Sequence, residues 1–135
     1  MKGSAPFPTT FWLVCPDLER RIGTLESHNA VDSMEELLRD IPERWNEYHK
    51  THTRLRLSLM SPGRKRYLRR FRPSVFKALR RGGIGGMQYR LGDFYVKCIH
   101  LQAASYLALG RHPASRWMEN ALSSWECERC LCGAD

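Results

Sequence analysis

The segment FYVKCIHLQAASYLALG, residues 94–110, is the most apolar part of this chain of 135 residues. Its later part predicts a buried helix that ends at Gly110, because glycine readily adopts the conformation that closes a helix. Apolar residues also recur at helical spacing on both sides of this segment. The sequence therefore predicts a mainly α, compact single-domain fold.

Prolines mark the starts of several other predicted helices, since proline fits the first helical position. The first predicted helix follows a capping Cys15, begins at Pro16 and stops before Ser27. The second runs from Asp32 or Ser33 to before Pro42, and the third from Pro42 to about Leu59. Two more are predicted, one from Val75 to Arg81 with Ser74 as its N-cap and one from Pro113 that carries Trp117, Met118, Leu122 and Trp125. Ser61–Gly63 is predicted to end the third of these. Arg64–Arg72 fits either a helix or an irregular basic loop. Only Phe7–Val14 and Gln88–Val96 have strand signals, and they would pair as a small two-stranded ribbon.

Length and composition predict one domain over residues 1–135, with residues 127–135 as a cysteine-rich C-terminal tail. No apolar run approaches the roughly 20 residues that cross a bilayer, so we expect no membrane partner. Pro6 and Pro8 interrupt the N-terminal region, which argues against a signal peptide. We therefore expect a cytoplasmic protein whose thiols stay reduced. The sequence does not specify an oligomeric state.

The five cysteines suggest a metal site. Cys127 and Cys130 have the spacing at which two thiolates bind one metal ion, and Cys132 adds a third thiol. Zinc or an iron–sulfur cluster needs four ligands, so Cys15 or Cys98 would have to complete the set. The predicted ligands are Cys15, Cys98, His100, Cys127, Cys130 and Cys132. The alternatives are redox thiols and cysteines that simply pack as small apolar residues.

His100 lies two residues after Cys98, and that spacing restricts how the two could act together. On a helix, residues two apart point about 200° apart, so both reach one metal only where the chain is extended or just starting a helix. No catalytic set stands out in the sequence. A thiolate at Cys98, next to Lys97 and His100, would allow a cysteine-dependent enzyme as a weaker alternative.

Positive charge is concentrated in one segment. Residues 48–92 hold 13 basic residues and no acidic one, whereas the whole chain has a formal net charge of +8. Such a surplus indicates a nucleic acid or another polyanion as partner, with Tyr67 or Phe71 able to stack on a base. The predicted anion-binding residues are Arg64, Lys65, Arg66, Arg69, Arg70, Arg72, Arg80 and Arg81. The alternative is a solvated face whose charges meet the acidic first section of the chain.

The glycine run GGIGG, residues 82–86, matches neither a Walker loop nor a dinucleotide fingerprint. It could form a backbone anion nest beside Arg80, Arg81 and Lys97. The alternative is a tight connection where helices pack closely.

Several separated motifs together resemble a known family. They are FPTTFWLVCP (residues 7–16) followed by Leu18 and Leu25-Glu26, GIGG (83–86) followed by VKCIH (96–100), and a helix ending in Leu109-Gly110 and His112-Pro113. They are similar to the bacterial family of uncharacterised proteins catalogued as domain of unknown function five-hundred-and-one. The resemblance covers most of the chain and implies a small one-domain bacterial protein without an established activity. A site common to that family would centre on Cys15, Cys98 and His100, and the tail thiols would close it in this chain.

Overall fold

The computed structural model describes residues 9–127. This part of the chain contains the helices α1 (Pro16–Glu26), α2 (Ala30–Arg39), α3 (Pro42–Ser58), α4 (Pro62–Phe71), α5 (Pro73–Arg81), the short 3-10 helix η1 (Ile84–Gly86), α6 (Ile99–Leu109) and α7 (Ser115–Leu122). The predicted mainly α fold is confirmed. No strand occurs within residues 9–127, so residues 9–14 and 88–96 do not form the suggested ribbon.

The described residues divide into two compact units. Unit 1 contains Glu43–Leu91, which includes nearly all of α3 together with α4, α5 and η1. Unit 2 contains Phe11–Pro42 and residues 92–127, which include α1, α2, α6 and α7. A single domain over residues 1–135 stays a prediction.

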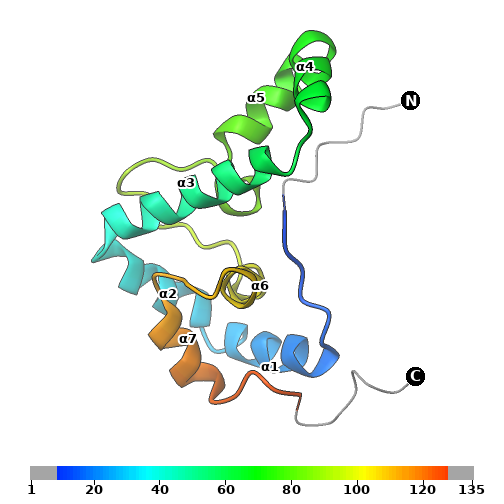
Figure 1. The fold of residues 1–135 in the computed structure, drawn as a ribbon. Helices are drawn as coiled ribbons and strands as arrows, with labels where there is room; N and C mark the ends of the chain where they lie inside the picture. Colours follow the sequence, from blue (N-terminus) through cyan, green and yellow to red (C-terminus); the bar gives the residue numbers. More distant parts are fainter. Residues whose placement is uncertain (1–8, 128–135) are drawn as a thin grey trace, which may run out of the picture. The chain divides into compact units, whose positions relative to one another are not determined.

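Unit 2 is built around α6. Figure 1 looks along this helix and shows α1, α2 and α7 near it. Each of the four helices contributes buried apolar side chains, namely Leu18, Ile22, Met34, Leu38, Ile99, Ala103, Met118 and Leu122. Gly110 ends α6 with a left-handed backbone at φ 69°, as the sequence predicts.

A buried polar chain links α6 to the segments before and after it. The Gln102 side-chain amide donates to the carbonyl of Val96 at 2.9 Å, and its oxygen lies 2.8 Å from Nε2 of His112. Nδ1 of His112 accepts from the backbone N–H of Ala114, so Nε2 is the donor to Gln102. These bonds satisfy buried polar groups that would otherwise cost about 1–3 kcal/mol each.

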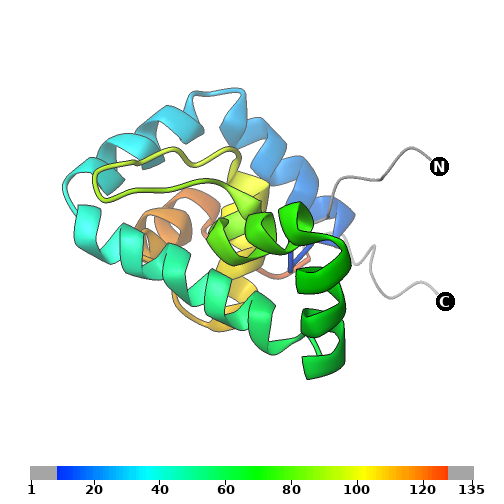
Figure 2. The same cartoon turned by 90° about the horizontal axis from the view of Figure 1, so that it is seen from above.

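Unit 1 consists of α3 and the segment that returns along it. The predicted α3 stripe is buried at Trp45, Tyr48 and His52, but Leu59 beyond the helix is 68% exposed. At the end of α3 the chain turns into α4 and α5, which lie side by side in Figures 1 and 2. We call this pair, residues 62–81, the basic hairpin.

Several helix boundaries differ from the predicted ones, since α2 begins at Ala30 and α7 at Ser115. Ser61–Gly63 follows the end of α3 as expected, and it also starts α4, because the Ser61 hydroxyl accepts from the backbone N–H of Arg64 and Pro62 takes the first position. For the same reason α5 begins at Pro73 and not after Ser74. The last helix stops at Leu122, since Ser123 has φ 62°, and Trp125 lies beyond it.

Candidate functional site

The glycine run in unit 1 turns its carbonyls inward. Arg56, which is buried, donates to the carbonyls of Leu79 at 3.0 Å, Gly82 at 2.6 Å and Gly83. Thr53 also donates to the Gly82 carbonyl, at 2.7 Å. Burial lowers the pKa of Arg56 from its usual value. The loop therefore binds a cation of its own chain.

Most N–H groups of this loop are occupied as well. Those of Gly82, Gly83, Gly86 and Met87 donate to backbone carbonyls within residues 78–87, and that of Ile84 donates to Nδ1 of His49 at 3.1 Å. A backbone anion nest needs free N–H groups that point to one spot. The loop therefore lacks the set of free N–H groups that the possible nest needs, and its bonds match the alternative of a tight connection.

The basic hairpin presents the cations that the sequence singled out. None of the residues of α4 is fully buried, and its Arg64, Arg66, Arg69 and Arg70 are exposed. Arg72 between the two helices and Arg80 and Arg81 at the end of α5 are exposed too. Only the inner edge of the hairpin is packed, where Phe76 is 8% exposed and the Arg69 guanidinium lies 5.1 Å from its ring centroid.

The helical period separates a packed side of α4 from a free side. Lys65 and Leu68 are the half-buried residues, and they lie about 60° apart on one side. Tyr67 and Phe71 lie about 110° around the helix from the middle of this side. They are 55% and 64% exposed, with ring centroids 5.1 Å apart. By the same period Arg64 borders this ring pair on one flank, and Arg66 and Arg70 border it on the other.

The hairpin cations have no acidic partners in the described part of the chain. Within residues 9–127 no ion pair involves Arg64, Lys65, Arg66, Arg70, Arg72, Lys77, Arg80 or Arg81. The alternative interpretation, in which these charges meet the acidic first section, therefore finds no such pair there. The result is a cationic and aromatic surface open to solvent.

The predicted thiol ligands are only partly described. Cys15 caps α1, with its sulfur accepting from the backbone N–H of Leu18 at 3.5 Å. Cys98 precedes α6 as its N-cap and is half-buried. Cys127 is the last described residue, while Cys130 and Cys132 lie outside the described residues.

Glu26 is the residue that organises the start of α6. Its Oε1 accepts from the backbone N–H of Ile99 at 2.7 Å and of His100 at 3.3 Å, and lies 2.9 Å from Nδ1 of His100. Nε2 of His100 lies 3.1 Å from the carbonyl oxygen of Glu19. Both imidazole nitrogens thus face oxygen acceptors, and metal binding by His100 would require one of these contacts to break.

The segment before the tail is tied to α1 by Arg21. Its guanidinium donates to the carbonyls of Ser124 at 2.7 Å and Glu126 at 2.8 Å, while its Nε lies 3.2 Å from the buried carboxylate of Asp17. Cys127 therefore follows a segment that is anchored on the helix that Cys15 begins.

Residues 9–127 contain no group of three or more histidine, cysteine or acidic side chains that could hold a metal ion. Cys15, Cys98, His100 and Cys127 alone do not form a ligand set, so the metal site stays a prediction that depends on Cys130 and Cys132. The cysteine-dependent enzyme at Cys98 also stays a prediction. No helix within the described residues is long and apolar enough to cross a membrane.

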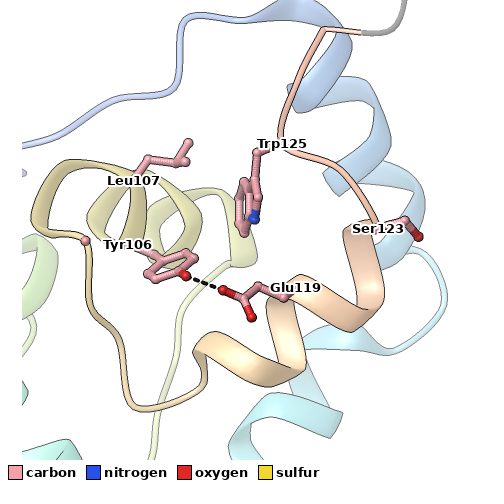
Figure 3. A pocket seen from close by; sticks show the side chains of 6 residues that line it. Tyr106, Leu107, Glu119, Ser123 and Trp125 are labelled. Atoms are coloured by element: carbon pink, nitrogen blue, oxygen red, sulfur yellow. Dashed lines mark hydrogen bonds between the residues drawn. The ribbon is translucent and has the colours of Figure 1, made fainter.

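None of the predicted site residues lines a shallow pocket of about 400 Å³ in unit 2. Figure 3 shows Tyr106 bonded to Glu119 within it, with Trp125 beside them. The bond to Glu119 raises the pKa of Tyr106. Leu107, Gly110 and Ser123 complete the lining.

The sequence interpretation missed the structural roles of Glu26, Arg56 and His49. Each side chain binds backbone groups at least 23 residues away in sequence, so helical spacing gives no sign of the pairing. A weak signal for Arg56 is that residues 48–92 contain no acid, so a buried arginine there finds no carboxylate within its own segment.

The fold and the exposed hairpin define a small, basic helical protein. The family model for "Protein of unknown function (DUF501)" matches residues 1–120, so this chain belongs to that family. The match includes the whole basic hairpin, whereas Cys127, Cys130 and Cys132 lie after the matched residues. Comparison with curated proteins finds no match, and comparison with solved structures finds none either.

Proposed function

We propose that this protein binds a nucleic acid through the basic hairpin. The observation that carries the proposal is a helical face whose cations have no ion-pair partner among residues 9–127. Phosphate groups neutralise such cations and release condensed counterions, which drives binding without reading the sequence. No recognised base-reading motif is present, so we expect little sequence preference.

Arginine predominates among these cations, and its planar guanidinium can bind two phosphate oxygens at once. Arg66 and Arg70 lie one helical turn apart, about 6 Å, which is close to the phosphate spacing of an extended strand. One side of α4 is packed, because Leu68 is half-buried and the Arg69 guanidinium lies over the ring of the buried Phe76. The helix thus presents its cations at fixed spacing, although each side chain stays free to adapt.

The proposal is tested with two double variants that remove equal charge. Arg66→Gln/Arg70→Gln alters the hairpin, whereas Arg44→Gln/Arg116→Gln alters exposed arginines elsewhere. Fluorescence anisotropy with a labelled mixed-sequence oligonucleotide at low salt measures both. We expect at least about tenfold weaker binding for the hairpin variant and less than about threefold for the control. Equal weakening, or no binding by the unmodified protein, would overturn the proposal.

A second proposal concerns the thiols. We propose that Cys127, Cys130 and Cys132, with Cys15 or Cys98, hold zinc or an iron–sulfur cluster. Its support is the anchoring of residues 124–126 on α1 by Arg21, which brings the start of the tail onto the helix that Cys15 caps.

Metal analysis and a visible spectrum after aerobic and anaerobic purification test this second proposal. We expect close to one zinc ion or one cluster per chain, lost in Cys130→Ser/Cys132→Ser. The absence of stoichiometric zinc or iron from both preparations would remove the proposal, because a structural site of this kind binds tightly.

A further inference from the structure

We propose that the hairpin selects single-stranded nucleic acid, with Tyr67 and Phe71 as a platform on which its bases stack. This inference rests on the proposed function and names the form of nucleic acid that the same surface binds. Both rings stand on the free side of α4, 55% and 64% exposed. They touch each other at a centroid distance of 5.1 Å and a tilt of 42°, so they form one continuous aromatic surface.

The charges around the two rings suit a strand whose bases are turned toward the protein. Arg64 lies on one flank of the ring pair, and Arg66 and Arg70 lie on the other. A base on Tyr67 or Phe71 would therefore have its own phosphates within reach of a guanidinium. Base–aromatic stacking of this kind tolerates any sequence, because every base has a π face.

A duplex cannot use the rings in the same way. Its bases are already stacked on one another and expose only their edges in the grooves. It would meet the arginines of the hairpin but leave Tyr67 and Phe71 without a partner. The aromatic pair therefore adds affinity only for unpaired strands.

A second copy of this chain is a poorer occupant for the same surface. A symmetric dimer through the rings would place the hairpin of one copy against that of the other. Arg64, Arg66 and Arg70 would then face the same cations of the partner, and like charges in contact disfavour association. An anionic partner with flat apolar rings satisfies both parts of the surface.

The test compares three probes of equal length: a mixed 12-nucleotide single strand, the same strand with abasic sites, and the duplex. Tyr67→Ala/Phe71→Ala is measured beside Tyr67→Phe/Phe71→Trp, which keeps the rings, and Leu59→Ala, which removes another exposed apolar side chain of unit 1. Circular dichroism checks that each variant is folded, and we expect all to be folded because these side chains are exposed.

We expect the alanine double variant to bind the single strand about tenfold more weakly or worse, the loss that removal of base stacking gives. Its binding to the abasic strand and the duplex should match that of the unmodified protein. The ring-keeping variant and Leu59→Ala should bind all three probes normally. The unmodified protein should bind the single strand more tightly than either other probe.

Three outcomes would overturn the inference. The first is that the unmodified protein binds the duplex or the abasic strand as tightly as the single strand. This result would leave the proposed function intact. Another is an alanine variant that loses affinity for all probes alike. A third is self-association of the unmodified protein that this variant abolishes, which would assign the rings to a dimer. Failure to bind any probe would remove the proposed function itself.

Discussion

The charged side chains of unit 2 and those of the basic hairpin are used in opposite ways. In unit 2 the buried Asp17 pairs with Arg20 and Arg21, and Glu26 binds the start of α6. These charges hold the fold together. In the hairpin, Arg66 and Arg70 meet solvent with no ion-pair partner among the described residues. The hairpin cations are therefore available to a partner, and in its absence they repel one another.

Unit 1 repeats this contrast within itself. Arg56 is buried and bound to the carbonyls of the glycine loop, whereas the hairpin arginines are exposed. The same residue type is structural in one place and free in the other. Substitutions in the buried set should therefore change stability, and substitutions in the exposed set should change binding.

The largest effect is expected for Gly83→Ala. A Cβ at residue 83 would lie 2.1 Å from Nδ1 of His49, which accepts the Ile84 N–H. The loop would have to move away from α3, at a cost of about 3 kcal/mol or more in the free energy of unfolding. Chemical denaturation measures this cost.

Gly63→Ala is the matched control for that substitution. A Cβ at residue 63 meets no atom within 4 Å, and the residue lies in the first turn of α4. Its free energy of unfolding should be unchanged or up to about 1 kcal/mol higher. Similar losses for both substitutions would mean that the loop is not packed tightly on α3.

A smaller loss of stability should follow when the pH falls. Burial, with help from the charge of Arg56, lowers the pKa of His52 from 6.5 to about 4. Between these values the unfolded chain binds the proton and the folded chain does not, so acid removes stability. The loss should be on the order of 2 kcal/mol as the pH falls from about 6.5 to about 4.

Urea denaturation across this pH range checks the effect against His52→Gln, which should lose less stability on acidification. His28→Gln alters an exposed histidine and should follow the unmodified protein. An unchanged pH dependence in His52→Gln would show that His52 does not stay neutral through its burial.

The sequence predicted much of this fold because its helices are locally encoded. Cys15-Pro16 and Gly110 mark helix ends through backbone chemistry that involves only nearby residues. The apolar spacing of Trp45, Tyr48 and His52 is likewise a local signal. These features need no knowledge of distant partners.

Other features depend on contacts that sequence spacing does not encode. The carbonyls of Gly82 and Gly83 face Arg56 on α3, and the Ile84 N–H binds His49 of the same helix, so the possible anion nest lacks free N–H groups. The exposure of Tyr67 could not be predicted either. The sequence allowed either a helix or a loop at residues 64–72, and tertiary contacts decide which side of the helix is packed. The role of Glu26 arises only when α6 packs on α1.

Glu26→Gln should have a moderate effect in unit 2. The amide oxygen can still accept the two backbone N–H groups, but the negative charge next to the helix start and His100 is lost. We expect the free energy of unfolding to fall by about 1 kcal/mol. Glu36→Gln removes an exposed carboxylate of α2 and serves as the control. Thermal melts compare the stability of the two variants. Equally small losses of stability in Glu26→Gln and Glu36→Gln would count against the role of Glu26.

The smallest effect on stability is expected in the hairpin. Arg66→Gln/Arg70→Gln removes two exposed cations from a segment without acids, and surface changes of this kind usually stay within about 0.5 kcal/mol. Relief of repulsion would make the change slightly stabilising. A loss above about 1 kcal/mol in chemical denaturation would show that these arginines hold the fold and are not free for a partner.

The salt dependence of binding tests the role of the hairpin most directly. The dissociation constant for a 12-nucleotide single strand is measured over a series of salt concentrations for the unmodified protein and for Arg66→Gln/Arg70→Gln. Each phosphate contact contributes about 0.7 to the slope of log affinity against log salt for single strands. We predict a steep slope that falls by about 1.4 in the double variant and stays unchanged in Arg44→Gln/Arg116→Gln. A slope near zero, or the same slope in all three proteins, would contradict nucleic-acid binding by the hairpin.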